Sequence, residues 1–117
     1  MNVVDILSKS LSSEGVDYTY EYIVTRNSLK LLDEGVVKEV QSYGIVIERR
    51  DNSLGKVFNI ERDCVKNISP QRHKVQALAK MLSSNLVSPI HFIEVIGEYI
   101  DDYISDYDRL FKETSIS

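Results

Sequence analysis

A histidine and two carboxylates share one side of the last helix that the sequence predicts. His91, Glu94 and Glu98 are spaced i, i+3 and i+7, so they project from a helix in nearly the same direction. Imidazole and carboxylate groups are ligands for first-row metals. The order H-x-x-E reverses the E-x-x-H pair of di-iron bundles, and no second helix carries such a pair. A metal or small-ligand site is therefore the alternative here, beside the simpler interpretation of a solvated acidic face.

The single cysteine, Cys64, is a candidate nucleophile that lies nine residues from a histidine, His73. A catalytic thiolate needs a base and an electropositive setting. The neighbouring Asp63 disfavours a negative thiolate, and nothing in the pattern orients His73. We therefore expect Cys64 to pack in the core. The chain also has no Gly-rich phosphate loop, G-x-S-x-G elbow or H-E-x-x-H motif, so we expect no catalytic residue and no cofactor.

Charges of opposite sign occupy different parts of the chain. Residues 56–80 contain six basic and two acidic residues, and residues 90–113 contain seven acidic and two basic residues. This separation favours either two solvated helix faces or docking of a partner. The basic patch predicted from it consists of Lys66, Arg72, Lys74 and Lys80. A net charge of −4 argues against nucleic-acid binding through this patch.

Three tyrosines on the last helix are the candidate interaction residues. Tyr99, Tyr103 and Tyr107 follow one another at i, i+4 and i+8. Tyrosine is favoured at interfaces because it provides a large contact area at a low cost in side-chain entropy. We therefore predict that these residues contact a protein partner or a second copy of the chain; in a dimer, an edge of the sheet is the alternative contact.

Length and composition describe the kind of domain that must position these groups. The chain has 117 residues, of which 43% are hydrophobic and 27% are charged. These values are ordinary for a single globular domain. There is no apolar run long enough to cross a bilayer and no pattern typical of a signal peptide. We expect a cytoplasmic protein that does not act at a membrane.

Alternating apolar residues predict three strands. The first is residues 16–26, where Tyr18, Tyr20 and Tyr22 share a face. The second is clearest at residues 43–48, where Gly44 indicates a bulge or a close backbone approach. The third is residues 56–65, in which one face consists of Phe58, Ile60, Arg62 and Cys64. Residues 27–35 are interpreted as a connection that ends in the turn signal Asp33-Glu34-Gly35.

The period changes after residue 66, and two helices follow. Ser69 and Pro70 suit the N-cap and N1 positions of the first helix, and Ser88 and Pro89 repeat this signal for the second. Strands followed by helices indicate an α+β fold. We predict a three-stranded antiparallel meander covered by two C-terminal helices. The predicted domain is residues 16–112, with a flexible N-terminal arm at 1–15 and a frayed tail at 113–117.

Three short motifs occur in order along the chain: Tyr43-Gly44-Ile45-Val46-Ile47-Glu48, Val65-Lys66-Asn67-Ile68-Ser69 and Ser88-Pro89-Ile90-His91-Phe92-Ile93-Glu94-Val95. Together they resemble a domain-of-unknown-function family of short proteins from Gram-positive anaerobic bacteria, over about residues 16–104. The segment that begins at Gly97 departs from the family pattern. The resemblance implies a bacterial cytosolic protein and supplies no activity, ligand or site residue.

The function predicted from these features is a small non-catalytic protein-interaction or regulatory module. Its partner would be another protein or a second copy of the chain. The alternative is a metal- or small-ligand-binding protein that uses the helix face of His91, Glu94 and Glu98.

Overall fold

The computed structural model describes residues 2–115 as four strands followed by helices. The strands are β1 (Asn2–Ser13), β2 (Val16–Asp33), β3 (Val36–Ser53) and β4 (Lys56–Ser69). The helices are α1 (Arg72–Ser84), the short 3₁₀ helix η1 (Pro89–His91) and α2 (Phe92–Ser115). The sheet is antiparallel with the order β1-β2-β3-β4, so each strand pairs with its neighbours in sequence.

Three hairpin turns of one kind produce this meander. Each consists of two residues, the second a glycine: Glu14-Gly15, Glu34-Gly35 and Leu54-Gly55. All six residues have a positive φ, between 50° and 79°. This is the backbone of a type I′ turn, whose twist matches that of the strands it joins. Glycine at the second position adopts this conformation without a steric cost.

The α+β class and the helix cover are confirmed, but the expected number of strands is wrong. Residues 2–13, interpreted above as an arm, form β1 and pair with β2 from Asn2↔Arg26 to Ser13↔Val16. The expected connection at residues 27–35 is also mostly strand, because β2 and β3 continue to the turn at Glu34-Gly35 as a two-stranded ribbon.

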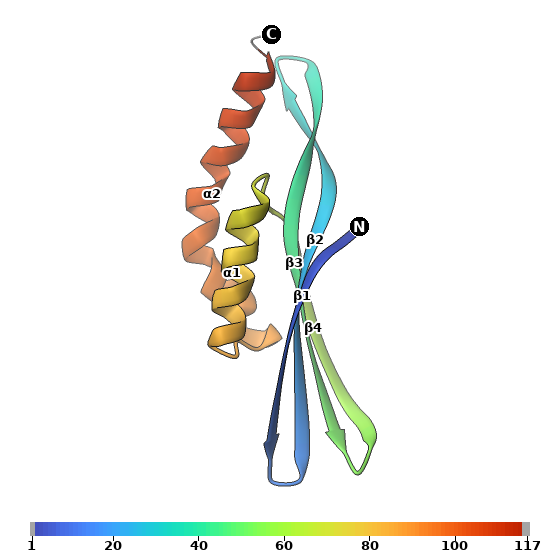
Figure 1. The fold of residues 1–117 in the computed structure, drawn as a ribbon. Coiled ribbons are helices and arrows are strands. Elements are labelled where there is room, and N and C mark those ends of the chain that lie inside the picture. The colour runs from blue at the N-terminus through green and yellow to red at the C-terminus, as the bar shows by residue number, and fades with distance from the viewer. Residues whose placement is uncertain (1, 116–117) are drawn as a thin grey trace.

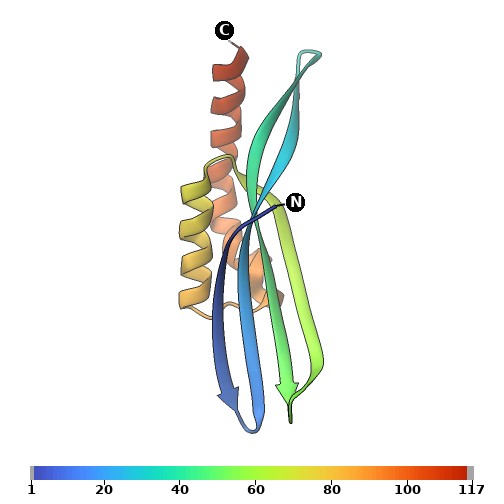
Figure 2. The same cartoon turned by 45° about the vertical axis from the view of Figure 1, so that its right-hand side comes forward.

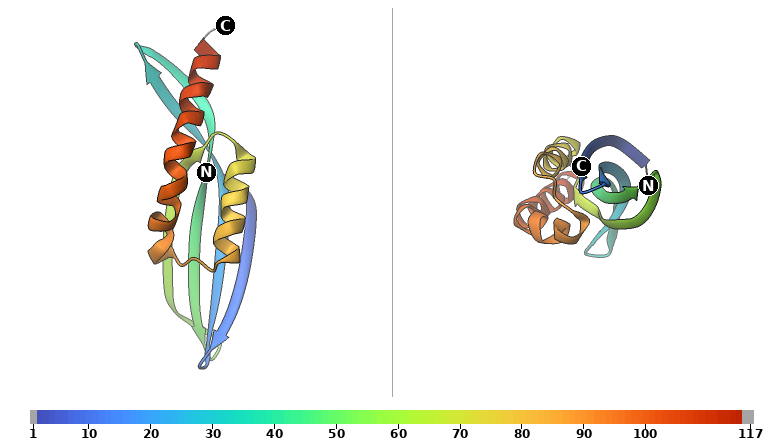
Figure 3. Two further views of the ribbon diagram at one scale, coloured as in Figure 1. Left: turned by 90° about the vertical axis from the view of Figure 1, so that its left-hand side faces the viewer. Right: turned by 90° about the horizontal axis from the view of Figure 1, so that it is seen from below.

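The molecule is elongated, with extents of 59 × 23 × 19 Å. Figure 1 shows α1 and α2 side by side against one face of the sheet, and Figure 2 shows the β2–β3 ribbon projecting beyond β1 and β4 at one end. The other two hairpin tips lie at the opposite end, past the helices. Figure 3 shows that the sheet is strongly coiled when seen along its length. The end of the sheet that carries the other two turns therefore extends past the helices, whereas α2 runs alongside the β2–β3 ribbon.

The core lies between the helices and one face of β2 and β3. The predicted face of alternating tyrosines is confirmed, since Tyr20 and Tyr22 are buried and Tyr18 packs against them. The helix residues buried in the same cluster are Val75, Leu78, Ala79, Leu82, Phe92 and Ile96. The Tyr22 hydroxyl donates a hydrogen bond of 2.8 Å to the Val87 carbonyl, so this buried polar atom is satisfied.

Burial of tyrosines predicts a loss of stability in alkali. Desolvation raises the pKa of Tyr22, Tyr103 and Tyr107 above its ordinary value. Above about pH 10 the unfolded chain loses these phenolic protons more readily than the folded chain. The unfolded state then binds fewer protons, so the free energy of unfolding falls as the pH rises. Urea unfolding at about pH 8 and about pH 11 measures this fall, which should be smaller in Tyr22→Phe. A wild-type stability that does not change between these two pH values would contradict the prediction.

Gly44 lies where β3 approaches β4 most closely, as its place in a strand predicts. A Cβ atom on Gly44 would lie 2.2 Å from the Val65 carbonyl oxygen and 2.3 Å from that of Lys66. The register between β3 and β4 also shifts here, between Tyr43 and Ile45. The end of β4 therefore packs on a position without a side chain.

The predicted inner face of the third strand is wrong. Phe58 and Ile60 are 60% and 57% exposed, and Cys64 is also exposed. The reason is register: Val65 pairs with the core residue Ile45, so Cys64 opposite Val46 lies on the face away from the helices. Exposure also removes the expected core role of Cys64.

The first predicted helix start is displaced, and the second is confirmed. Ser69 is the last residue of β4, and α1 begins at Arg72 with Gln71 at the N-cap. Ser69 pairs with Tyr43 in the ladder, which keeps it in the strand. Pro89 does occupy the first turn of η1, after Ser88. At the other end α2 includes residues 113–115, and residues 116 and 117 lie outside the described part of the chain.

Candidate functional site

The open edge of β4 carries exposed apolar side chains on a strand that lacks one neighbour. β4 is an outer strand of the sheet, so one side of its backbone has no partner strand. Near its start, Val57, Phe58 and Ile60 are 49%, 60% and 57% exposed. Figure 1 places this part of β4 at the lower end of the sheet, beyond the helices. Exposed apolar side chains on an open edge are typical of strand-addition sites.

The hydrogen bonds of β4 show which of its backbone groups face outward. The Cys64 N–H donates a hydrogen bond of 2.8 Å to the carboxylate of Asp63, which indicates that this N–H faces outward. The register is unbroken from Asn59 to Val65. Along an edge strand the backbone groups of every second residue face outward, so those of Arg62 and Ile60 face outward as well. In the described part of the chain, no side chain hydrogen-bonds to the backbone of residues 56–63. This stretch is called the β4 edge below.

A bulge and a groove shape the β4 edge. Asn59 pairs with Asp51 while Val57 pairs with Asn52, which leaves Phe58 as the extra residue of a β-bulge. Beside the edge lies a groove of about 470 Å³. The residues that line it are Ile60, Glu61, Arg62, Asp63, Pro89 and Ile90. Ile90 is 68% exposed and continues the apolar surface from the strand onto η1. An added strand would therefore contact both the backbone of β4 and this helical turn.

A polar cluster holds the β4 edge in place from the helix side. The buried Asp51 accepts hydrogen bonds from the Arg49 Nε at 2.9 Å and from the Asn59 Nδ2 at 3.0 Å. The Arg49 guanidinium also lies 3.2 Å from Glu61 and 5.7 Å from the centre of the Tyr18 ring. These contacts join β3 to β4, so the edge is anchored before any partner binds.

Charged side chains lie on the face of the sheet away from the helices. Arg50 forms ion pairs with Glu21 and, at 3.7 Å, with Glu48, and Arg62 lies 3.4 Å from Glu48. Arg62 keeps 58% of its side chain exposed. One cation of this row thus stands directly at the β4 edge, two residues from Ile60.

The opposite edge, β1, differs because side chains cap it. The Arg72 guanidinium donates a hydrogen bond of 3.2 Å to the Val4 carbonyl, and the Asp5 carboxylate accepts one of 3.0 Å from the Ile6 N–H. The rest of the strand is rich in serine and carries Lys9. Capped groups and a lysine disfavour strand addition.

The three predicted interaction tyrosines lie on the face of α2 that packs toward the sheet. Tyr99 and Tyr103 are partly buried against the core. Tyr107 is half-buried, and its hydroxyl lies 2.5 Å from that of Ser42. Burial raises the pKa of Tyr107, and the hydrogen bond with Ser42 opposes this rise. The exposed apolar residues of α2 are instead Ile93 and Ile104.

The predicted basic residues do not form one cluster. Lys74 is bound to the buried Asp106 at 2.7 Å and lies over the Tyr103 ring. Arg72 caps β1, as described above. Lys80 lines a hollow of about 430 Å³ beside β1, and Lys66 lines a different hollow.

The predicted metal ligands are exposed on the first turns of α2. The His91 Nδ1 lies 3.9 Å from a carboxylate oxygen of Glu94, with 66% and 85% of these side chains exposed. Glu98 is exposed as well. Within residues 2–115, no group of three His, Cys, Asp or Glu residues is arranged to hold a metal ion.

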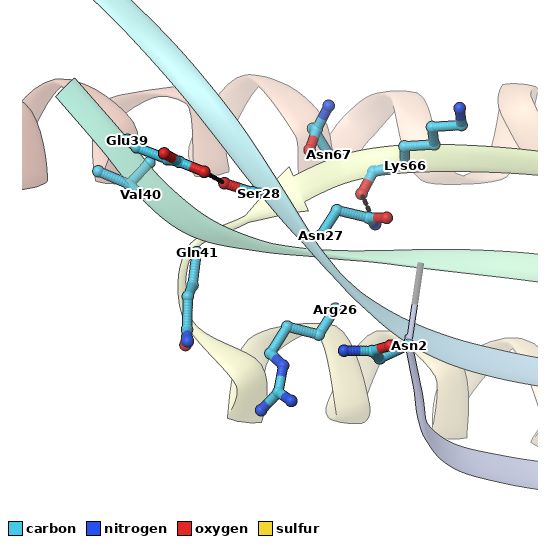
Figure 4. A pocket seen from close by; sticks show the side chains of 9 residues that line it. All are labelled: Asn2, Arg26, Asn27, Ser28, Glu39, Val40, Gln41, Lys66 and Asn67. Carbon is cyan, nitrogen blue, oxygen red and sulfur yellow. Dashed lines mark hydrogen bonds between the residues drawn. The ribbon is translucent and has the colours of Figure 1, made fainter. Parts of the chain in front are cut away.

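A hollow of about 830 Å³ lies where the β2–β3 ribbon leaves the rest of the sheet. Its lining is mostly polar and consists of Asn2, Arg26, Asn27, Ser28, Glu39, Val40, Gln41, Lys66 and Asn67. Figure 4 shows Arg26 and Lys66 extending to opposite sides of β2. Asn27 donates a hydrogen bond to the Lys66 carbonyl, and Ser28 donates one to Glu39. The two cations therefore do not converge on one anionic ligand.

Sequence reasoning missed the β4 edge because it placed Phe58 and Ile60 in the core. One available signal was Arg62, which shares their alternation and is a poor core residue. A further result concerns membranes: none of the helices in the described chain has the length and apolarity needed to cross one.

Comparison with known proteins gives the family of the chain. A family model with the description "Family of unknown function (DUF6514)" matches residues 1–102, and the chain belongs to this family. No curated protein and no solved structure matches it. The matched region contains the whole sheet, α1, η1 and the beginning of α2, so the β4 edge lies inside it.

Proposed function

We propose that this member of the DUF6514 family is a non-catalytic protein-interaction module that binds an extended strand of a protein partner along the β4 edge. The observation that carries the proposal is the combination of exposed Phe58 and Ile60 with a stretch of outward backbone groups, residues 56–63, that no described side chain caps; the next outward N–H, that of Cys64, is bound by Asp63. Strand addition obtains its affinity from main-chain hydrogen bonds and its specificity from pockets for alternate side chains. The groove beside Ile90 supplies such a pocket.

The contrast between the two edges supports this choice of surface. The β1 edge has its carbonyl at Val4 and its N–H at Ile6 occupied by side chains. Natural sheets blunt edges that must not pair. The β4 edge, by contrast, has no side chain of the described residues bound to its backbone over residues 56–63, which leaves a longer stretch open for pairing.

A proline test separates strand addition from other modes of binding. Ile60→Pro removes an outward N–H and leaves the inward bonds of β4 to β3, because proline is tolerated on edge strands. Ser10→Pro is the matched control, since Ser10 faces outward on β1 by the same alternation from Ile6. A phage-displayed library of short peptides is selected on the wild-type protein.

We expect selected peptides with alternating apolar residues that bind Ile60→Pro at least about tenfold more weakly, which is about 1.4 kcal/mol. Ser10→Pro should bind them like the wild type. Circular dichroism and a thermal melt check that both variants fold. Peptides that bind the wild type and Ile60→Pro equally well would show that the β4 edge is not the binding surface.

A further inference from the structure

We propose that the strand added to the β4 edge is the β4 edge of a second copy, which forms a two-fold dimer centred on Ile60. This inference rests on the proposed function and names the partner of the same surface. The inference follows from the charges along the edge. When two identical strands pair antiparallel about a two-fold axis, the residue n positions before the centre of one strand lies opposite the residue n positions after the centre of the other.

Like charges exclude most centres. A pair centred on Glu61, Arg62 or Asp63 would place that charged residue directly opposite its own copy. Like charges directly opposite one another destabilise a sheet.

Two further centres also fail. Centring on Asn59 would place Lys56 opposite Arg62. Centring on Phe58 would put the axis on the β-bulge, where the regular ladder is interrupted. Ile60 is therefore the centre that remains in the stretch from Phe58 to Asp63.

The pairing centred on Ile60 makes favourable contacts. Ile60 meets its own copy, and because its backbone groups face outward, the two residues can exchange both hydrogen bonds. Arg62 comes opposite Phe58 of the second copy, and a guanidinium next to an aromatic ring is attractive. Glu61 comes opposite Asn59, an amide donor for a carboxylate. Ile60 thus gains an apolar neighbour and Phe58 a cationic one, whereas Val57, beyond the bulge, comes opposite Asp63.

Dimerisation of this kind closes the assembly. Both β4 edges are consumed at the two-fold axis, and the outer edges of the combined sheet are two β1 strands. These are the strands on which Arg72 and Asp5 cap backbone groups. A symmetric contact through one kind of edge stops at two copies, whereas β1-to-β4 pairing would continue into a fibre. A dimer through β4 thus leaves as its outer edges the strands whose Val4 carbonyl and Ile6 N–H are already occupied.

Cysteine trapping tests the register. In a Cys64→Ser background, Ile60→Cys should form an intermolecular disulfide on mild oxidation, because paired residues at a two-fold axis have Cα atoms about 5.5 Å apart. Phe58→Cys should not form one, since four residues of strand, about 13 Å, separate it from its own copy. A mixture of the Phe58→Cys and Arg62→Cys chains should cross-link as a heterodimer. A disulfide in Phe58→Cys without one in Ile60→Cys would overturn the register.

The mass in solution tests the partner. Sedimentation equilibrium should give a dimer for the wild type and for Ser10→Pro, and an at least about tenfold weaker dimer for Ile60→Pro. Ile60→Lys, which keeps the ladder intact and sets two like charges opposite each other, should weaken it similarly. A wild-type monomer, or a dimer that neither Ile60 variant weakens, would overturn the inference. If the chain is a monomer but the binding of selected peptides depends on Ile60, the proposed function stands and the dimer inference fails. If the chain is a monomer and peptide binding does not depend on Ile60, the proposed function and the dimer inference both fail.

Discussion

Replacing Gly44 with alanine is expected to lower the free energy of unfolding by about 3 kcal/mol. The added methyl group would lie 2.2 Å and 2.3 Å from two carbonyl oxygens of β4. These are backbone atoms, so no side chain can rotate away to make room. The strands must move apart at the end of β4, where Ile68 and Ser69 are buried. Urea unfolding followed by circular dichroism measures the change.

Gly97 provides the matched control. It lies in α2, and a Cβ atom there would have no neighbour within 4 Å. Gly97→Ala should therefore raise the free energy of unfolding by about 0.5 to 1 kcal/mol, because alanine is the better helix former. If both substitutions stabilise the protein, the close approach of β3 and β4 at Gly44 is wrong.

Asp106→Ala is expected to cost about 2 to 3 kcal/mol of stability, because it leaves polar partners without their acceptor. The Asp106 side chain is 2% exposed, and its Oδ2 lies 2.7 Å from the Lys74 Nζ. The same oxygen accepts a hydrogen bond of 3.3 Å from the Ser69 hydroxyl, which itself accepts one from the Gln71 N–H. One carboxylate thus connects α2, α1 and the end of β4. The cost stays below that of a fully buried pair because Lys74 is 32% exposed and can reach water.

A second acidic residue of α2 serves as the control, because its replacement removes the same charge without removing the contacts of Asp106. Asp102 is exposed, so Asp102→Ala should change the stability by no more than about 0.5 kcal/mol. A double-mutant cycle with Lys74→Met isolates the pair. Equal effects of Asp102→Ala and Asp106→Ala would contradict the connecting role of Asp106.

The buried half of the fold was predictable because its pattern is strong. Tyr18, Tyr20 and Tyr22 alternate without interruption, and the apolar stripes of both helices recur at helical spacing. These features gave the α+β class and the core face of β2. Phe92 and Ile96 are buried on the α2 face that the spacing predicted.

The strand that the sequence analysis did not predict, β1, is indicated by a feature that appears only when several segments are compared. Residues 2–13 are rich in serine, and their alternation is weak, so local propensity favours no strand. Pairing with β2 overrides that propensity, as tertiary context often does in sheets. The missed signal is the recurrence of a glycine at positions 15, 35 and 55, each the second residue of a hairpin turn.

The candidate site was less predictable than the fold. Phe58 and Ile60 have the composition of a core strand, and only the register with β3, set by the shifts near Gly44 and Asp51, places them at an open edge. Conversely, Tyr103 and Tyr107 have the composition of an interface, and packing turns them toward the sheet. Whether an apolar residue lies in a core or on a binding surface depends on the number of strands beside it, which local sequence does not encode.

The regular spacing of the three turns limits how a gene for this fold can change in length. One codon inserted inside β2 or β3 would reverse the faces of every residue between the insertion and the next turn, and would move core tyrosines into water. Codons added at a turn leave the faces unchanged, because the new residues leave the ladder as a loop. One-residue insertions are therefore expected to be tolerated at the three hairpin tips and not inside the central strands β2 and β3.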